Sequence, residues 1–341
     1  MNKLKLVMVI EAIIILILAG FLICNIFFSQ NNSATQQVAY CDKHFYDNQV
    51  CLLSPRVYTG ILKPENFLIL NFKPLQEDIQ NYITTNNLNI SVYVLNIRDS
   101  ASFGINSNKG FEPASLNKLP IAILILKKVE QKELSLDSLL PIKDEDRDSR
   151  SGTLYNTTAN AMNVRDLLHY MLSESDNTAF RVLEEQVTLE DLQKLSVYLN
   201  YYTKDIDYIP PIINNTYQIT AKSTSNLFMS LYLSSILTPG DSELILKDLS
   251  NSTFNINKYA GLPDSVIVSQ KYGDYYVGDI NDFHNCGIIY MGQDRIFYGI
   301  MTQGMDEEKA PVVIGNIVNK IYNYVISQQG NSSDDSNQLT S

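Results

Sequence analysis

The chain has 341 residues, of which 45% are hydrophobic and 18% are charged, and its formal net charge at pH 7 is −11. A chain of this size and hydrophobic content can form one sizeable domain with appended segments. The negative charge argues against a nucleic-acid partner, because binding to phosphates needs a cationic surface. Three histidines and four scattered cysteines form no recognisable metal-ligand cluster, and no glycine-rich phosphate loop is present, so we expect no metal and no other cofactor.

Residues 1–28 are predicted to form a transmembrane signal-anchor. Lys3 and Lys5 precede an apolar run, 6–28, in which Glu11 is the one acidic residue. A run of this length can cross the hydrocarbon core of a bilayer. The lysines are expected to stay on the cytoplasmic side, which places the rest of the chain outside a cell membrane that it crosses once. The alternative is a cleaved signal peptide, but no small-x-small cleavage pattern follows the run.

The segment after the anchor, residues 29–65, begins with the polar stretch SQNNSATQQ and is predicted to be an extracytoplasmic stalk. Cys41 and Cys51 lie within it, on the side of the membrane where oxidation is permitted. The sequence leaves two states open for this pair, a small disulfide loop and two free thiols.

Residues 66–328 carry the periodic patterns expected of a folded domain, and residues 329–341 are polar and predicted to be disordered. Strand patterns occur at both ends of the domain, over residues 89–98, 102–106, 266–271, 286–291 and 296–302. Helix patterns occur over residues 73–86, 164–183, 223–237, 241–249 and 308–327. This order predicts an α/β (α+β) domain, in which a mostly antiparallel sheet is built from both ends and flanked by helices, with an all-helical subdomain inserted between them.

The stretch FEPASLNKLPIAILILKKV, residues 111–129, contains a serine and, three positions later, a lysine. If Ser115 opens a helix, Lys118 lies almost one turn further along the same face, which brings an amine close to a hydroxyl. A serine hydroxyl is a poor nucleophile at neutral pH and needs a neighbouring base. A lysine can be that base when burial lowers its pKa. The alternative interpretation is an N-cap serine beside a solvated lysine.

Two further motifs follow in chain order, S-D-N at residues 175–177 and K-Y-G at residues 271–273. The motifs S-x-x-K, S-D-N and K-T-G together are the signature of class A β-lactamases and penicillin-binding proteins. The lead-in FEPASLNKLPIAIL and the stretch NVRDLLHYMLSESDNTA also read as in that family. Residues 71–327 therefore resemble the class A β-lactamase-like serine hydrolases of the β-lactamase and penicillin-binding protein superfamily.

The resemblance implies a role for each residue of the first two motifs. Ser115 would be the nucleophile that becomes acylated, and Lys118 would take its proton. Ser175 would relay a proton to the leaving nitrogen, because a hydroxyl both donates and accepts. Asn177 would hold the substrate amide with its side chain.

The third motif is implied to bind the substrate. Lys271 would attract a substrate carboxylate and keep Lys118 deprotonated. Gly273 would let the substrate backbone lie against the edge of the strand. The backbone N–H groups of Ser115 and Asp274 would form the oxyanion hole.

Two residues of this region depart from the family pattern. Tyr272 stands where the family has threonine or serine, and its ring would either point to the opposite face of the sheet or partly fill the cleft. Asp274 lies beside the implied oxyanion hole. A carboxylate pointing into the cleft there would repel an anionic substrate, whereas one pointing to solvent would not.

A third departure concerns release of the acyl group. Class A β-lactamases carry a glutamate between the second and third motifs that activates the deacylating water. The glutamates in this interval all belong to expected helices, and they are Glu184, Glu185, Glu190 and Glu243. The corresponding loop, TKDIDYIPPIINNTYQIT, offers Asp205 or Asp207 instead, with shorter side chains. The sequence therefore leaves open whether deacylation occurs.

Three functions follow from the resemblance. The first is a membrane-anchored, extracytoplasmic serine hydrolase of class A β-lactamase type, which forms an acyl-enzyme on Ser115 with β-lactams or D-alanyl peptide-like amides. The second is a penicillin-binding-like D,D-peptidase with slow deacylation, and the third is a non-catalytic homologue that binds the cell wall. The complete set of nucleophile, base and proton relay favours an enzyme. We expect a monomer whose partners are a small-molecule β-lactam or a peptidoglycan-type peptide, together with the membrane.

Overall fold

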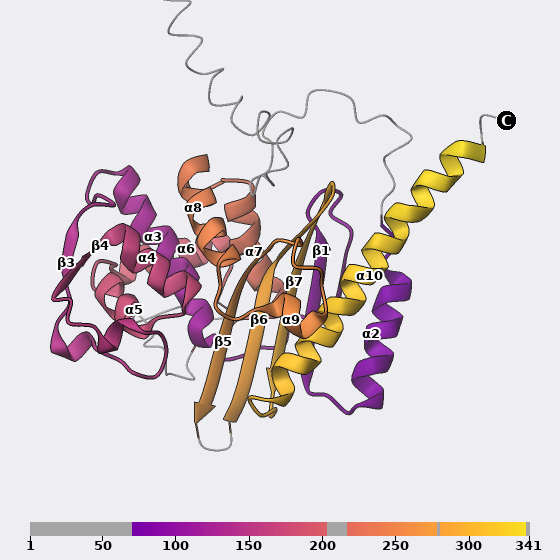
Figure 1. Cartoon of the computed structure of the whole chain (residues 1–341), viewed down its shortest axis with the longest axis horizontal. Coiled ribbons are helices and arrows are strands. Elements are labelled where there is room, and N and C mark those ends of the chain that lie inside the picture. Colours follow the sequence, from indigo (N-terminus) through magenta and orange to yellow (C-terminus); the bar gives the residue numbers. More distant parts are fainter. Residues whose placement is uncertain (1–69, 203–216, 278–279, 339–341) are drawn as a thin grey trace, which may run out of the picture. The chain divides into compact units, whose positions relative to one another are not determined.

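A five-stranded antiparallel sheet with the strand order β2-β1-β7-β6-β5 forms the centre of the fold. The computed structural model describes residues 70–202, 217–277 and 280–338. Two strands come from the start of this region and three from its end, namely β1 (Ile90–Asn96), β2 (Ser102–Ile105), β5 (Val268–Val277), β6 (Ile280–Met291) and β7 (Asp294–Gln303). The predicted antiparallel sheet, built from both ends of the domain, is thereby confirmed (Figure 1).

Strand β1 lies inside the sheet, and its sequence shows why. Val92 pairs with Ile105 of β2 on one side and with Ile300 of β7 on the other. All of its residues except Tyr93 are buried. A strand covered on both faces can be apolar on both faces, which agrees with the run ISVYVLN.

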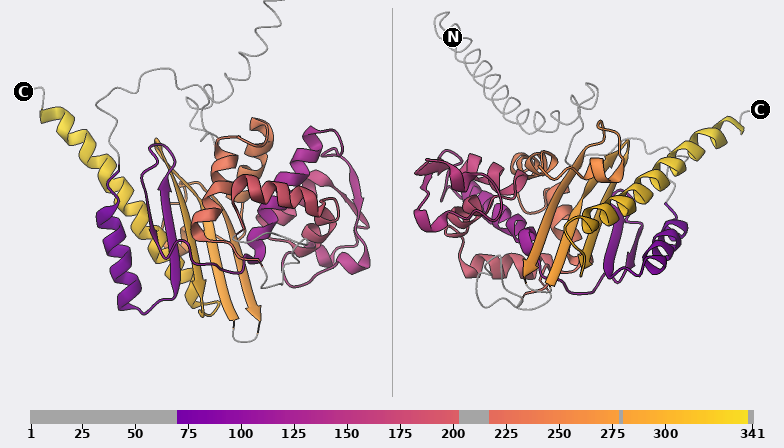
Figure 2. Two further views of the ribbon diagram at one scale, coloured as in Figure 1. Left: turned by 180° about the vertical axis from the view of Figure 1, so that it is seen from behind. Right: turned by 60° about the horizontal axis from the view of Figure 1, so that its bottom comes forward.

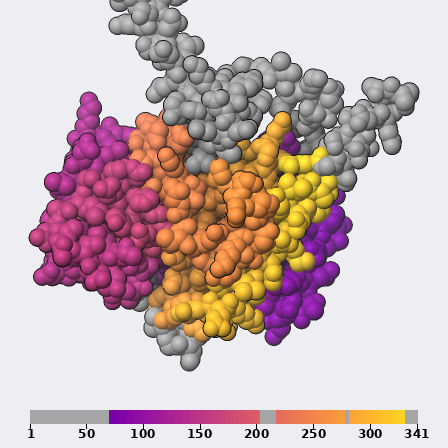
Figure 3. Space-filling view, viewed as in Figure 1, coloured from indigo at the N-terminus to yellow at the C-terminus, as the bar shows by residue number. Residues whose placement is uncertain are grey.

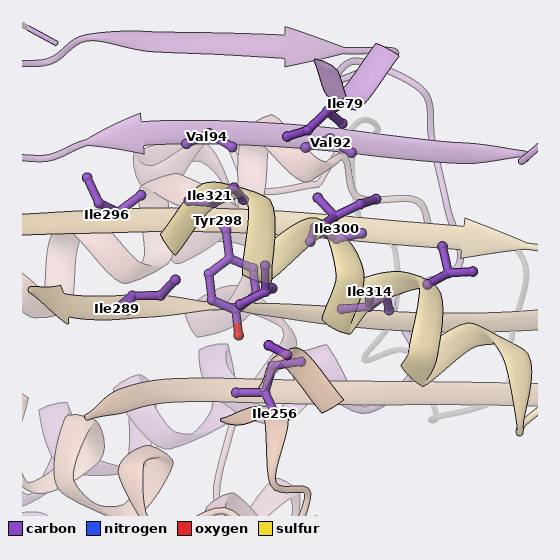
Figure 4. Close-up of a cluster of buried hydrophobic side chains, with 14 of the residues drawn as sticks. Ile79, Val92, Val94, Ile256, Ile289, Ile296, Tyr298, Ile300, Ile314 and Ile321 are labelled. Carbon is purple, nitrogen blue, oxygen red and sulfur yellow. The ribbon is translucent and has the colours of Figure 1, made fainter. Parts of the chain in front are cut away.

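Helices α2 (Lys73–Thr85), α9 (Ile256–Ala260) and α10 (Lys309–Gln338) cover one face of the sheet (Figures 1 and 2). Isoleucines of these helices pack against Val92 and Tyr298 of the sheet in one buried cluster (Figure 4). The buried residues of α2 are spaced four positions apart, so that they form a single apolar stripe. This cluster anchors the sheet on the face that lies away from α7.

Helix α7 (Ala221–Tyr232) packs on the opposite face, where the ring of Phe228 lies 5.5 Å from the ring of Phe297 in β7. Thr220 caps the start of α7, because its side chain accepts a hydrogen bond from a backbone N–H of the first turn. Helix α8 (Pro239–Ser250) follows and packs against β5. Helix α8 thus packs against the edge strand β5.

The inserted subdomain lies beside the β5 end of the sheet. Its helices are α3 (Lys118–Glu130), α4 (Val164–Ser173), α5 (Asn177–Glu184) and α6 (Leu189–Leu199). It also contains a small antiparallel pair, β3 (Leu139–Pro141) and β4 (Ala161–Asn163), so the subdomain is not all-helical as predicted. Strands of three residues are too short to show an alternating pattern. In Figure 3 the subdomain (magenta) meets the sheet-bearing part (orange) on the face shown.

Residues 164–183, predicted to be one helix, form the two helices α4 and α5. Ser175 has a left-handed backbone conformation with φ +56°, which a right-handed helix cannot contain. Asp176 then caps α5, and its side chain accepts a hydrogen bond from the backbone N–H of Ala179. The S-D-N motif therefore lies at a turn between two helices.

Two elements extend further than the sequence predicts. Strand β5 continues to Val277 instead of ending at residue 271, because its cross-strand partners outweigh the low strand propensity of glycine and aspartate in KYGDYYV. Helix α10 continues to Gln338, into the segment predicted to be disordered. The sequence of that part, QQGNSSDDSNQ at residues 328–338, contains no apolar side chain and therefore gives no periodic signal.

Within the described ranges, no helix combines the length and the hydrophobicity needed to cross a bilayer. The predicted anchor, residues 1–28, lies outside the described residues, and so does the predicted stalk, residues 29–65, with Cys41 and Cys51.

Candidate active site

Ser115 lies in a short 3-10 turn, Ala114–Asn117, that leads directly into α3. The residue is buried, with 4% of its surface exposed. Ala114 before it has φ +47°, a left-handed conformation that costs a residue with a side chain roughly 1–3 kcal/mol. Strained backbone of this kind is concentrated at functional sites. The turn places the serine beside Lys118, the first residue of α3.

The amine of Lys118 occupies the centre of the site. Its Nζ lies 2.9 Å from Ser115 Oγ and 2.8 Å from Asn177 Oδ1. It also lies 3.1 Å from the hydroxyl oxygen of Ser175 and donates to the backbone carbonyl of that residue. The lysine is completely buried. The structure therefore brings together all four residues predicted from the first two motifs.

Burial lowers the pKa of Lys118 from 10.5 to about 7. The carboxylates of Asp274 and Asp176 act in the opposite direction, but burial outweighs them. An amine with a pKa near 7 is neutral in a large fraction of molecules at neutral pH. It can then accept a proton from a hydroxyl 2.9 Å away.

Lys271 approaches the Ser175 hydroxyl from β5. Its Nζ lies 2.8 Å from Ser175 Oγ and 2.8 Å from the backbone carbonyl oxygen of Tyr272. The side chain is completely buried, and burial together with the charge of Lys118 lowers its pKa well below the usual value. The resemblance implies that Lys271 keeps Lys118 deprotonated, whereas in the structure burial is the largest cause of the lowered pKa of Lys118.

Residues of the segment before α4 form hydrogen bonds with the turn that carries Ser175 and hold it in place. Asp176 Oδ2 accepts a hydrogen bond of 2.8 Å from the backbone N–H of Leu154. The backbone N–H of Asn177 donates to the carbonyl of Ser151 at 3.1 Å. Gly152 has φ +86°, and a Cβ added there would lie 2.1 Å from Asp176 Oδ2. Only glycine allows this close approach, which fixes the second motif in place.

Gly273 brings β5 against the Ser115 turn. A Cβ added at this position would lie 3.0 Å from the backbone nitrogen of Ser115 and 3.2 Å from that of Leu116. The glycine therefore places the β5 backbone next to the amide groups of the turn. The backbone N–H groups of Ser115 and Asp274, which are implied as the oxyanion hole, can point to the same place only if β5 lies this close to the turn.

Asp274 is the residue after this glycine, and its side chain is exposed. Of the two orientations that the sequence leaves open, the structure has the solvent-exposed one. The carboxylate still lies near enough to raise the pKa of both Lys118 and Lys271. It therefore contributes an exposed negative charge close to both lysines.

The ring of Tyr272 packs on the α9 side of β5. It lies 5.3 Å from the ring of Phe254 and is stacked 6.2 Å from the ring of Phe283 on β6. Its face also lies 4.4 Å from Nζ of Lys271. The bulk of the side chain thus belongs to the opposite face of the sheet, as one of the two sequence alternatives proposed.

The hydroxyl of Tyr272 reaches the site itself. It lies near the side chains of Ser151, Thr253 and Ser175, and burial, followed by the charge of Asp274, raises the pKa of Tyr272. The side chain therefore satisfies both alternatives, since its ring is packed behind the strand while its hydroxyl partly fills the site.

Sequence reasoning missed two groups that support the nucleophile turn. Tyr202 donates its hydroxyl to Asn117 Oδ1 at 2.8 Å. The ring of Phe180 lies 5.9 Å from Nζ of Lys118. Tyr202 gives no signal in the sequence, because it meets Asn117 only through the packing of the subdomain. Phe180 lies three residues after Asn177 on the buried face of α5, so its apolar side chain is a sequence signal that could have identified it.

Two of the glutamates between the second and third motifs form ion pairs with lysines away from Ser115. Glu185 is 2.7 Å from Lys143, and Glu190 is 2.6 Å from Lys194. Burial raises the pKa of Glu184, at the end of α5, to about 7. Among the described residues, the hydrogen bonds of Lys118 Nζ reach no carboxylate.

Asp205 and Asp207, the alternative bases in the loop after α6, lie outside the described residues. Glu243, the fourth glutamate of the interval, belongs to α8.

An antiparallel sheet with an inserted helical subdomain, and a buried serine–lysine pair at the start of a subdomain helix, are the features of β-lactamase-like serine hydrolases. The sequence profile described as the Beta-lactamase enzyme family matches residues 74–325, well over half of the chain. The chain therefore belongs to the β-lactamase enzyme family.

Individual relatives are distant. The β-lactamase VEB-1 of Pseudomonas aeruginosa is 22% identical over 269 residues, which cover 73% of this chain and 90% of VEB-1. A β-lactamase of Proteus vulgaris is 24% identical over 201 residues, which cover 57% of this chain and 67% of that protein.

Two solved structures show the same fold. The TLA-3 extended-spectrum β-lactamase superposes with a TM-score of 0.68 at 18% identity, covering 75% of this chain and 100% of that one. PBP-A superposes with a TM-score of 0.66 at 20% identity, covering 75% of this chain and 97% of that one. At these identities the likeness establishes the fold alone.

Proposed function

We propose that this chain is a serine hydrolase of class A β-lactamase type that forms an acyl-enzyme on Ser115 with β-lactams or D-alanyl peptide-like amides. The observation that carries the proposal is the 2.9 Å contact between Ser115 Oγ and Nζ of Lys118, a fully buried amine with a pKa of about 7. Burying a lysine costs stability, and a protein that only binds does not need one beside a serine. A structure of similar fold, a mutant of PBP-A, is an acyl-enzyme complex with penicillin G, which supports β-lactams as substrates.

Acylation begins with attack of Ser115 Oγ on the amide carbonyl carbon. As the new C–O bond forms, the hydroxyl proton passes to Nζ of Lys118. The carbonyl oxygen becomes negatively charged, and the backbone N–H groups of Ser115 and Asp274 donate hydrogen bonds to it. The close contact of Gly273 with the turn supports this arrangement.

Collapse of the intermediate breaks the C–N bond, and the leaving nitrogen needs a proton. Ser175 Oγ lies 3.1 Å from Nζ of Lys118, so the hydroxyl gives its proton to the nitrogen and regains one from the lysine. Lys118 is then neutral again, and the acyl group stays on Ser115. Asn177 Oδ1 is held by Lys118, which leaves Nδ2 to donate to a substrate carbonyl.

A second candidate, a penicillin-binding-like D,D-peptidase with slow deacylation, shares this first half-reaction. The engagement of Glu185 and Glu190 by lysines elsewhere favours it over rapid hydrolysis. Rapid turnover requires a base that activates water beside the acylated serine, and either Asp205 or Asp207 would have to take that role. The two candidates differ in the lifetime of the acyl-enzyme.

The test is a time course of intact mass after mixing the purified full-length protein with benzylpenicillin. An adduct of one penicillin that persists for hours supports the D,D-peptidase candidate, and an adduct that decays as penicilloate accumulates supports the β-lactamase. Ser115→Ala should give no adduct. Ser102→Ala, an exposed serine of β2, is the matched control and should behave as wild type. If the wild type gives no adduct with penicillin or with a D-alanyl-D-alanine peptide, the non-catalytic cell-wall-binding alternative replaces both candidates.

We also propose that the enzyme is anchored by residues 1–28 and acts outside the cytoplasm as a monomer. The support is the apolar run 6–28 behind two lysines. Protease added to intact cells should degrade the domain but spare a tag at residue 1. Protection of the domain in intact cells contradicts this orientation.

A further inference from the structure

Lys271 is the cation that a substrate carboxylate would approach, and its amine has no open side. The residue is completely buried. Two of its hydrogen bonds go to Ser175 Oγ and to the Tyr272 carbonyl, each at 2.8 Å. The face of the Tyr272 ring lies 4.4 Å from the same Nζ, in the geometry of a cation–π contact. These three contacts and the complete burial of the side chain enclose the amine.

Lys118 offers no alternative anchor for a carboxylate. Its Nζ is completely buried and contacts the side chains of Ser115, Ser175 and Asn177. A substrate anion that bound this amine would displace the nucleophile or the proton relay. Both lysines therefore act inside the protein and present little positive charge at its surface.

Arg150, near the same site, is also paired. Its Nε lies 2.9 Å from Asp148 Oδ1, and its Nη2 contacts the other oxygen of that carboxylate. The side chain of Asp148 is 5% exposed and holds Arg181 at 3.0 Å as well. The arginine thus completes a structural ion pair, and its charge is largely balanced where it stands.

Among the described residues, those of β5 that follow Lys271, namely Tyr272, Gly273 and Asp274, are neutral or negative. The hydroxyl of Tyr272 lies near the side chains of Ser151 and Thr253. The exposed charge next to them is the carboxylate of Asp274, two positions along β5. A second carboxylate roughly 7 Å from Asp274 would bind roughly five- to tenfold more weakly, and a cation more tightly by the same factor, at an effective dielectric of about 20 and with the screening of physiological salt.

We infer that the substrate presents a neutral polar or cationic group, and not a carboxylate, to the surface formed by Tyr272 and Asp274. This inference rests on the proposed function and narrows its substrate class. An acyl donor whose carboxylate is amidated, or a peptide that continues beyond the cleaved bond or bears an amine there, fits the described residues. A free C-terminal carboxylate does not. Tyr272 and Asp274 are then the specificity residues of the site.

The test compares two acyl donors that differ in this one group, benzylpenicillin and its carboxamide. The second-order rate of adduct formation on Ser115 is measured by intact mass for each donor in the full-length protein. Each rate is divided by the rate of alkaline opening of the same donor in buffer, which removes the difference in intrinsic reactivity. The wild type should give a carboxamide-to-acid ratio above one.

Two substitutions locate the cause. Asp274→Asn should lower the ratio roughly five- to tenfold, chiefly by speeding acylation by the acid. Tyr272→Thr should lower it further by opening Lys271 to the carboxylate. Asp137→Asn removes one exposed negative charge from the inserted subdomain and should leave the ratio unchanged. In the wild type, added salt should speed acylation by the acid, and in Asp274→Asn this effect should be smaller.

A wild-type ratio below one overturns the inference, as does a ratio that neither Asp274→Asn nor Tyr272→Thr lowers. Either result leaves the proposed function standing, because adducts on Ser115 still form. If neither donor forms an adduct on Ser115, the proposed function itself is refuted and the inference with it. If Tyr272→Thr folds poorly, the carboxamide-to-acid ratio of Asp274→Asn alone still decides the test.

Discussion

The contact between Gly273 and the Ser115 turn makes Gly273→Ala an informative perturbation. The new Cβ would lie 3.0 Å from the backbone nitrogen of Ser115, 3.2 Å from that of Leu116 and 3.2 Å from Ala114 Cβ. Ordinary contacts of a methyl group with such atoms are a few tenths of an ångström longer, so β5 or the turn must move apart. Overpacking of this kind costs about 1–3 kcal/mol of stability. The same displacement moves the backbone N–H groups of Ser115 and Asp274, which are implied as the oxyanion hole, away from each other. We therefore expect acylation to slow about 10- to 100-fold.

The assay pairs urea unfolding with the rate of adduct formation on Ser115. Gly240→Ala is the matched control, because a Cβ added at Gly240 in α8 meets no atom within 4 Å. That change should leave acylation unaffected and keep stability within about 0.5 kcal/mol of the wild type, since Gly240 lies in the first turn of α8 and its Cβ would meet no neighbour. Wild-type acylation by Gly273→Ala would refute the idea that the close approach of β5 sets the geometry of the site.

Further predictions concern the buried charges. Because the neutral amine of Lys118 is the base and its pKa is about 7, the acylation rate should rise with pH below about 7 and level off above it, and a profile that is flat from pH 5 to 8 contradicts the assignment. In the unfolded chain the pKa of Lys118 returns to 10.5, so between about pH 7 and 10.5 the unfolded state binds more protons than the folded state. The free energy of unfolding of the wild type, relative to that of Lys118→Met, should therefore rise with pH over this range, and urea unfolding measures it. Asp176→Ala removes the acceptor for the Leu154 N–H and the cap of α5. We expect a loss of about 2–4 kcal/mol in the free energy of unfolding. A loss below about 0.5 kcal/mol would show that other contacts hold the S-D-N turn.

The sequence predicts the sheet well because its strands have local signals. The run ISVYVLN and the strand candidate at residues 296–302 are apolar enough to identify as buried, and both lie inside the sheet. The meeting of Ser115 with Lys118 follows from their spacing, and the fold then brings Ser175 and Lys271 to the same point. These residues lie far apart in the chain, so their meeting was predictable only through the family motifs.

What the sequence could not supply depends on contacts made in three dimensions. The left-handed φ of Ser175 interrupts a segment that otherwise reads as one helix, and no residue type at that position announces it. The place of Tyr272 is set by Phe254 and Phe283, which come from a loop and from β6. The pairing of Tyr202 with Asn117 likewise exists only in the folded chain.

The central claim is that Ser115 becomes acylated with Lys118 as its base. The most direct measurement is peptide mapping of the penicilloyl adduct by tandem mass spectrometry after a short exposure of the full-length protein to benzylpenicillin, with Lys118→Ala in parallel. The account predicts the added mass on Ser115 and at least a hundredfold slower labelling of Lys118→Ala. Labelling of any other residue, or labelling of Ser115 at an unchanged rate without the lysine, would contradict it.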